Sequence, residues 1–463
     1  MGEIVDLILE AKYVLTMSRG KNLIIDGAVA VNGDRIIDVG RRDEVRKRFK
    51  GEEVLSYDKA AILPGFIDAH THNSQTLLRG VITDHEINIP PIWLRYLIPY
   101  ESLLKPEDVK LISTLTQLNM IENGVTTFLE AGSPNPEKVA EAAEETGIRG
   151  VITPSTMDMG DVPESMKMST DEAIKRTVSL IENWNGRANG RIRIWFSLRE
   201  LILCTQELYF KFKELSERYG VGVTTHISEA HAEIEFSLER FGKRPIERLH
   251  EIGFLGENIV LAHAAFLTSK EVKLIAESRA NVVYCPSIDH MLMAPPRVPE
   301  MLSLGINVAL GSDGGFKTGI DMLSEMRLAS IILKQQYGFP FHDRMGIPAE
   351  KFLEMATSNG ARALLWDTEI GSIERGKKAD IIVIDLSKPH TTPINDPITT
   401  IIYAANSGDI KTTIIDGRIL MKDKKLAYKD LEKVLGRSME RGLEILREIK
   451  AHLVDNSFSR RTV

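Results

Sequence analysis

Several histidines and one aspartate stand where they could act on a single metal ion. His70-Thr71-His72, His226, His263 and Asp313 each end a short apolar run. On a β-strand, positions i and i+2 point to the same side, so His70 and His72 could face one ion together. Three of these imidazoles together with the carboxylate suit a divalent transition metal, zinc first, with an open position for water. Water at such a site is a strong nucleophile near neutral pH, which predicts hydrolytic chemistry.

The runs that these residues end belong to a regular alternation in the middle of the chain. Eight short apolar runs alternate with segments of helical spacing, and this predicts an α/β fold with parallel strands. An open doubly wound sheet would fit the same alternation, but eight units favour a (β/α)8 TIM barrel, whose strands end at one mouth where active sites lie. The eight runs are Ala61–Ala69, Val125–Leu129, Gly150–Thr153, Ile192–Leu198, Val221–Ile227, Ile259–Ala264, Asn281–Cys285 and Asn307–Leu310.

Both ends of the chain have a different texture. Short β-rich runs separated by turns fill the first 60 residues or so, with a hairpin signal at Asn32-Gly33-Asp34. Similar runs return at Asp380–Ile384 and Thr412–Ile415. One small sheet domain built from both termini is therefore expected. The segment from about Lys429 to His452 has a single long helical pattern.

The composition excludes several classes of function. The 463 residues are 43% hydrophobic and 27% charged, the balance of a soluble globular protein, and the net charge of −7 does not favour binding to nucleic acid. The two cysteines form no C-x-x-C motif, which excludes the cysteine-ligated nucleobase deaminases. No apolar run approaches the ~18 residues of a membrane span, and Glu3 and Asp6 do not fit a signal peptide. A cytoplasmic protein is expected.

Six short motifs follow one another in order along the chain. This ordered set resembles the signature of the amidohydrolase superfamily. Within it, the chain is most similar to the branch of S-adenosylhomocysteine/methylthioadenosine deaminases, guanine deaminases and triazine hydrolases. The resemblance covers nearly the whole chain. The motifs are Pro64-Gly65-Phe66-Ile67-Asp68-Ala69-His70-Thr71-His72, Leu77-Leu78-Arg79-Gly80, His226-Ile227-Ser228-Glu229, Ala262-His263, Gly311-Ser312-Asp313-Gly314 and Gly371–Asp380.

The resemblance implies an architecture in three parts. A metal-dependent barrel is expected over 61–366, and a small composite β-sandwich over 1–60 plus 367–428. A helical tail over 429–463 completes the chain. Relatives of this kind commonly form oligomers, so a homo-oligomer is expected as well.

The resemblance also implies roles for the residues at the strand ends. The metal ligands correspond to His70, His72, His226 and Asp313. Glu229 corresponds to the proton shuttle and His263 to the residue that polarises the attacking water, so the expected catalytic residues are Glu229, His263 and Asp313. Binuclear relatives use a lysine on the fourth strand, and Arg191–Leu198 contains none. One divalent ion per chain is therefore expected, zinc first, with iron or manganese possible.

The expected substrate contacts point in two directions. Arg199 stands where adenosine-type deaminases have a purine-binding histidine and guanine deaminases have an arginine that meets the base. Gln75 also matches the guanine deaminases. Glu101 instead matches the adenosine-type residue that binds ribose hydroxyls. His290, in a segment that departs from the family pattern, is a further candidate contact. The substrate is thus left open among purines, purine nucleosides and pterin-like heterocycles.

The prediction is a zinc-dependent hydrolytic deaminase of an aminated N-heterocycle that releases ammonia. A triazine-type chloro- or aminohydrolase is the nearest chemical alternative. A non-catalytic assembly protein of the same superfamily is the alternative of another class, and the intact ligand positions argue against it. The only partner expected is a small-molecule substrate, with no nucleic acid and no membrane.

Overall fold

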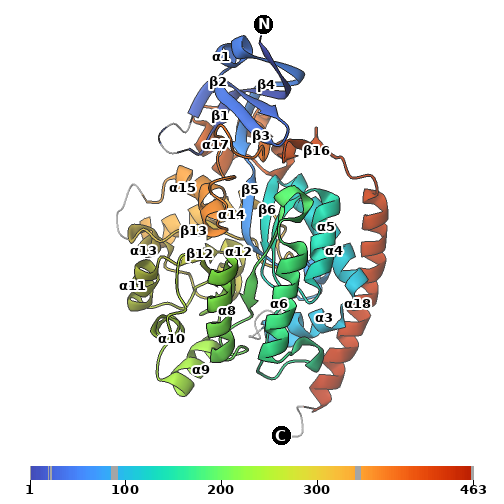
Figure 1. Ribbon diagram of the computed structural model, residues 1–463, viewed down its shortest axis with the longest axis vertical. Coiled ribbons are helices and arrows are strands. Elements are labelled where there is room, and N and C mark those ends of the chain that lie inside the picture. Colours follow the sequence, from blue (N-terminus) through green and yellow to red (C-terminus); the bar gives the residue numbers. More distant parts are fainter. Residues whose placement is uncertain (1, 19, 21–22, 85–91, 339–345, 460–463) are drawn as a thin grey trace.

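The parallel strands of the middle region end where the candidate site is expected. The computed structural model describes residues 2–459 except 19, 21–22, 85–91 and 339–345, and side chains as far as 449. It has a mixed α/β fold (Figure 1), with one parallel sheet in the order β5-β6-β7-β8 and another in the order β13-β12-β11-β10-β9. These strands are β5 (Phe66–Thr71), β6 (Val125–Glu130), β7 (Arg149–Ile152), β8 (Ile192–Ile194), β9 (Phe196–Leu198), β10 (Val223–Ile227), β11 (Ile259–His263), β12 (Asn281–Tyr284) and β13 (Val308–Leu310).

The two parallel sheets adjoin each other at both edges. β8 and β9 are separated by Trp195 alone, and a parallel bridge between Thr71 and Asp313 links the end of β5 to the residues after β13. This arrangement is consistent with the expected parallel barrel. The expected single run Ile192–Leu198 is thus divided between two strands.

A second expected run, Ala61–Ala69, is also divided. Its first part ends β4 (Phe49–Pro64), which pairs with β1 and β14, and its second part begins β5. The break lies at Pro64-Gly65, where a Cβ on Gly65 would come within 2.1 Å of the Thr126 side chain. Only glycine allows the chain to pass from one sheet to the next at this point. The periodicity did not show this because both parts are buried and apolar.

The strands from the two ends of the chain form one eight-stranded sheet. Its order is β17-β16-β15-β14-β4-β1-β2-β3, so strands from residues before 65 and after 380 lie side by side. A separate cluster of buried apolar side chains, including Leu9, Val29 and Ile381, packs within it. The remaining strands are β1 (Glu3–Leu15), β2 (Leu23–Asn32), β3 (Arg35–Arg41), β14 (Ile381–Asp385), β15 (Ile410–Ile415), β16 (Arg418–Lys422) and β17 (Lys425–Leu426).

Helices follow most of the parallel strands and cover them on the outside (Figure 1). Their limits have local causes. α6, for example, begins at a capping box in which Ser169 and Glu172 bond each other's backbone. No helix in the described part of the chain is long and apolar enough to span a bilayer. The helices are α1 (Arg42–Arg48), α3 (Ile98–Leu103), α4 (Pro106–Glu122), α5 (Pro136–Thr146), α6 (Thr170–Trp184), α7 (Arg187–Gly190), α8 (Gln206–Tyr219), α9 (His231–Phe241), α10 (Pro245–Glu251), α11 (Ser269–Ser278), α12 (Pro286–Leu292), α13 (Val298–Ser303), α14 (Met322–Leu333), α15 (Ala349–Met355), α16 (Ser358–Ala363), α17 (Pro397–Tyr403) and α18 (Leu431–Ser459).

A buried ionic network joins the parallel strands to the eight-stranded sheet. Arg149, on β7, is fully buried and donates to Asp380 at 2.7 Å and to Asp416 at 2.8 Å. Replacing Arg149 with methionine would leave two buried carboxylates without their main partner, so we expect a loss of ~3–5 kcal/mol of stability. The urea midpoint of unfolding measures this. Lys211→Met, which removes an exposed ion pair with Glu214, is the matched control and should cost no more than about 1 kcal/mol. Equal midpoints for the two variants would contradict the expectation.

Candidate metal and catalytic site

The expected ligands come together at the C-terminal ends of the parallel strands. His70 lies near the end of β5 and His72 just after it, while His226 lies on β10 and Asp313 follows β13. The Nε2 atoms of His72 and His226 are 3.2 Å apart. The Nε2 atoms of His70 and His72 each lie 3.5 Å from Asp313 Oδ1. Four residues separated by up to 243 positions in sequence therefore present their donor atoms to one point.

The chemistry of these donors fits a divalent metal. The donor atoms of His70, His72 and His226 all lie within 4.8 Å of one another, as do those of His70, His263 and Asp313. Both ring nitrogens of His70 and Nδ1 of His72 are buried without a hydrogen-bond partner, which is costly unless a ligand satisfies them. Burial lowers the pKa of His70, His72 and His226, which keeps them neutral, the form that binds a metal.

The surrounding backbone fixes the orientation of the ligands. His226 Nδ1 lies 2.7 Å from the carbonyl oxygen of Arg199, to which it donates, so its Nε2 is free to face the other ligands. His263 and Asp313 adopt left-handed backbone angles, with φ of +66° and +59°, and Ser228 does so at +50°. Such conformations are strained for these residue types and concentrate at functional sites.

His263 is held by a partner that the sequence motifs did not reveal. Its Nδ1 lies 2.8 Å from Asp289 Oδ1, and both side chains are buried. Burial alone would lower the pKa of His263, but the hydrogen bond and charge of Asp289 raise it to about 10. The ring therefore keeps both protons at neutral pH, and Nε2 can donate to an oxygen in the site. Asp289 lies, like His290, in the segment that departs from the family pattern. Only its contact with His263 in the fold identifies it as the partner of that histidine.

Glu229 lies beside these histidines. One of its carboxylate oxygens is within 4.8 Å of donor nitrogens of both His226 and His263, and its side chain is only partly buried. Burial is the main cause that raises the pKa of Glu229, to about 7. A carboxyl group with a pKa near neutrality can accept a proton and return it during one reaction cycle.

The expected substrate residues Gln75, Glu101 and Arg199 form one buried network. Arg199 Nη1 lies 3.0 Å from Glu101 Oε2, and Gln75 Nε2 donates to Glu101 Oε1 at 2.8 Å. The sequence suggested that Arg199 and Glu101 favour different substrates, but the two side chains are paired. Arg199 neutralises Glu101, and Gln75 Oε1 stays buried without a partner.

A second carboxyl group lies close to this network. Glu130 directly follows the apolar run of β6 and is fully buried, and its Oε2 accepts the Asn73 backbone N–H at 2.8 Å. Burial raises its pKa to about 8, and its Oε1 is without a partner. Sequence reasoning passed over Glu130, although an acidic residue at the end of an apolar run was the available signal.

His290 has a different position from the other candidates. Its Nε2 lies 2.6 Å from the hydroxyl of Tyr284, and the side chain is half-buried on α12. It does not line the small cavity in which Glu229 and Asp313 lie. The geometry therefore gives His290 a contact with Tyr284 and no contact with the candidate ligands.

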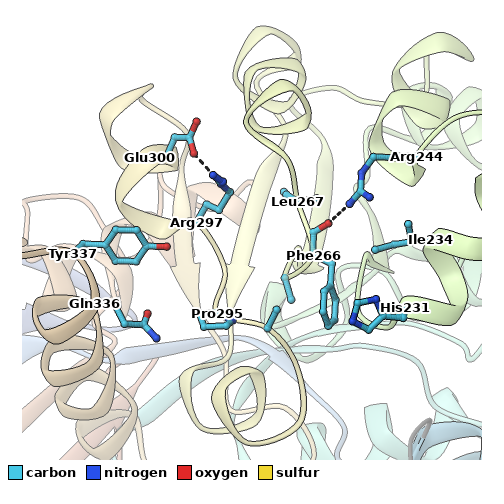
Figure 2. A pocket seen from close by; sticks show the side chains of 12 residues that line it. His231, Ile234, Arg244, Phe266, Leu267, Pro295, Arg297, Glu300, Gln336 and Tyr337 are labelled. Atoms are coloured by element: carbon cyan, nitrogen blue, oxygen red, sulfur yellow. Dashed lines mark hydrogen bonds and ion pairs between the residues drawn. The ribbon is translucent and has the colours of Figure 1, made fainter. Parts of the chain in front are cut away.

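Two cavities open at this end of the parallel strands. The one that contains Glu229 and Asp313 has a volume of about 50 Å³ and mainly apolar walls, among them Trp93, Ile288 and Phe316. The larger one, about 680 Å³, contains none of the expected site residues (Figure 2). In Figure 2 the His231 and Phe266 side chains lie together on one side and Gln336 and Tyr337 on the other. The donor geometry, rather than cavity size, thus locates the chemistry. The lining residues of the larger cavity are His231, Ile234, Arg244, Ala265, Phe266, Leu267, Ala294, Pro295, Arg297, Glu300, Gln336 and Tyr337.

Comparison with known proteins gives matches over nearly the full length. The model of the Amidohydrolase family matches residues 61–420. A 5-methylthioadenosine/S-adenosylhomocysteine deaminase of Caldanaerobacter subterraneus is 35% identical over 449 residues, 96% of this chain and 99% of that protein. A 5′-deoxyadenosine deaminase of Methanosarcina acetivorans is 32% identical, over 93% of this chain and 96% of that one. The crystal structure of an adenosine deaminase from Xanthomonas campestris with bound zinc has a TM-score of 0.90 and 29% identity, over 97% and 100% of the two chains.

Proposed function

Since this chain belongs to the amidohydrolase family, we propose that it is a metal-dependent deaminase that removes the amino group from the purine ring of a nucleoside by hydrolysis. The observation that carries this proposal is the position of the Glu229 carboxylate, within 4.8 Å of donor nitrogens of His226 and His263. The full-length similarity to enzymes named for the deamination of adenosine derivatives supports the same reaction.

His70, His72, His226 and Asp313 would hold one divalent ion, zinc first. The zinc in the adenosine deaminase structure supports this choice of ion. When bound, the ion would supply a water molecule that loses its proton readily at neutral pH. Asp313 fits the ligand role because burial, which would raise its pKa, is outweighed by the adjacent His70 ring and the charge of His263, which lower it.

The protein's own residues then carry out the proton transfers. The oxygen of water adds to the ring carbon that bears the amine, and Glu229 accepts the water proton. His263, held by Asp289, donates from Nε2 to the oxygen as charge develops there. Glu229 gives its proton to the amine nitrogen, and the remaining proton of the water passes to the adjacent ring nitrogen. The C–N bond then breaks, ammonia leaves, and the ring carbon retains a carbonyl.

The Glu101–Arg199 pair would bind the sugar of the nucleoside. Arg199 donates to Glu101 in a buried setting, and the Glu101 side chain can accept hydrogen bonds from ribose hydroxyls. The apolar walls beside Glu229 suit a flat heterocycle and an uncharged 5′ substituent. Gln75 would orient the carboxylate, and His290 would contribute only through Tyr284.

The experiment is an ammonia-release assay over a panel of substrates. The panel contains adenosine, 5′-deoxyadenosine, methylthioadenosine, adenine, guanine, a pterin and a chlorotriazine. The proposal expects ammonia from the nucleosides and little from the free bases. Release of chloride or alkylamine from the triazine, with no ammonia from any purine, would contradict it.

The role of Glu101 has its own test. Glu101→Gln keeps the shape but removes the charge, so it should lower kcat/KM for adenosine by ~10²-fold and lower that for 2′,3′-dideoxyadenosine far less. Glu107→Gln, at an exposed position at the start of α4, is the matched control and should leave both values unchanged. Equal losses on the two substrates would mean that Glu101 does not contact the hydroxyls. Arg199→Ala should resemble Glu101→Gln, because it leaves the Glu101 charge buried without its partner.

Predictions about domain architecture, assembly and location belong to the same proposal. The two parallel sheets would form one closed (β/α)8 barrel over 61–366, with the eight-stranded sheet as a composite β-sandwich from 1–60 and 367–428. The segment 429–463 would be a separate tail. The homo-oligomeric state and the cytoplasmic location stay predictions.

A further inference from the structure

One helix exposes an apolar stripe that no residue described by the structure covers. On α18, the side chains of Leu435, Met439 and Leu443 are 43%, 74% and 56% exposed. The spacing of four residues places them on one side of the helix. Among the residues whose side chains the structure describes, no other helix or strand carries three exposed large apolar residues.

The other side of α18 is fixed to the body of the protein. Val434, Ile445 and Ile449 are buried, and Arg441 donates to both carboxylate oxygens of Asp108 on α4, at 2.8 and 3.0 Å. Figure 1 shows α18 along the outer edge of the molecule, with the rest of the chain on one side of it only. A side chain added at Gly436 would meet nothing within 4 Å. The stripe is therefore held in a defined orientation and faces outward.

The charges at the two ends of the stripe favour one orientation of a partner helix. Glu432 and Arg447 are exposed and lie three residues before Leu435 and four residues after Leu443, so they continue the stripe at its two ends. A second α18 in antiparallel orientation would match this order, because each anion would then lie near a cation. A parallel orientation would set like charges against each other.

The apolar stripe and the charges at its ends agree on one register. With Met439 opposite its own copy, Leu435 meets the partner's Leu443. In the same register Glu432 lies within reach of the partner's Arg447. Each contact occurs twice, as a twofold interface requires. We propose that α18 binds α18 of a second copy of this chain in antiparallel orientation, about a twofold axis that passes beside Met439.

The size of the contact sets its expected strength. Residues 432–447 span about 24 Å of helix at 1.5 Å per residue. Contact along one pair of helices of this length falls at or below the low end of interfaces that bury about 800 Å² per partner. We therefore expect a dimer that dissociates on dilution. This inference does not depend on the proposed reaction.

Disulfide trapping in the full-length protein tests the register. The two native cysteines, Cys204 and Cys285, are buried, so added thiols report on the helix alone. Met439→Cys should form a covalent dimer under copper–phenanthroline oxidation, because the two copies lie within the 4.4–6.8 Å reach of a disulfide. Two copies of position 435 would be offset along the axis by eight residues, about 12 Å. Leu435→Cys should therefore fail to cross-link with itself, but should cross-link with Leu443→Cys in a mixture of differently tagged chains.

A charge exchange tests the same interface without added thiols. Arg447→Glu should weaken the dimer in sedimentation velocity at several concentrations, since it sets two acidic groups together at each end of the contact. Adding Glu432→Arg to that variant should restore association, because each pair then has opposite charges again. Restoration would not occur if the single change acted by disturbing the helix. Self-cross-linking of Leu435→Cys as fast as that of Met439→Cys would overturn the proposal. So would the absence of a wild-type dimer at every concentration, or a stable complex with another protein on the stripe.

Discussion

Replacing His226 with alanine is expected to remove metal and activity together. His226 supplies an Nε2 atom 3.2 Å from that of His72, and its ring is fixed through the Arg199 carbonyl. Loss of residues that only support metal ligands commonly costs 10–100-fold in metal affinity or activity, so loss of a ligand should cost at least ~100-fold. Metal analysis of protein purified from zinc-supplemented cells should fall from about one ion per chain to well below one. Ammonia release from adenosine should fall in parallel.

Two comparisons make this result specific. His250→Ala removes an exposed histidine from α10 and should leave both the metal content and the rate unchanged. Treatment of the wild type with a chelator should abolish the rate, and zinc should restore it. Two ions per wild-type chain would contradict the mononuclear site, and full metal content in His226→Ala would contradict the ligand assignment.

The clustering of the candidate metal ligands was predictable from sequence because each lies at the end of an apolar run. A strand that ends in His-x-His places both rings on one side, and parallel strands place their ends together, so no side-chain contact had to be known. The position of His263 beside these ligands was predictable for the same reason. Its raised pKa was not, because Asp289 reaches it from a helix 26 residues later.

The substrate region was less predictable, since its character depends on contacts between distant side chains. Arg199 and Glu101 are separated by 98 residues, and nothing in their local sequence indicates that one neutralises the other. Motif by motif they suggested different substrates, whereas together they form one buried polar unit. The division of 61–69 between two sheets was hidden in a similar way. It depends on how closely Thr126 approaches Gly65.

The pH dependence of the reaction should follow from Glu229. Burial raises its pKa to about 7, and the proposed role requires the ionised form to accept a proton from water. The rate should therefore fall as the pH decreases below about 7, because the carboxyl group becomes protonated. It should level off above that value until another group titrates.

Glu229→Gln is expected to separate catalysis from metal binding. Glutamine keeps the size of the side chain but cannot accept and return a proton, so kcat should fall by at least ~10²-fold. The decrease of the rate below pH 7 should disappear from the residual activity. Metal content should stay near that of the wild type, since His70, His72, His226 and Asp313 are unchanged. Glu235→Gln, at an exposed position on α9 six residues later, is the matched control and should retain both the rate and the pH profile. A near-normal kcat in Glu229→Gln would mean that another group is the proton shuttle. His263 with its partner Asp289 would then be the first to test, because His263 Nε2 is a further proton donor close to the candidate ligands.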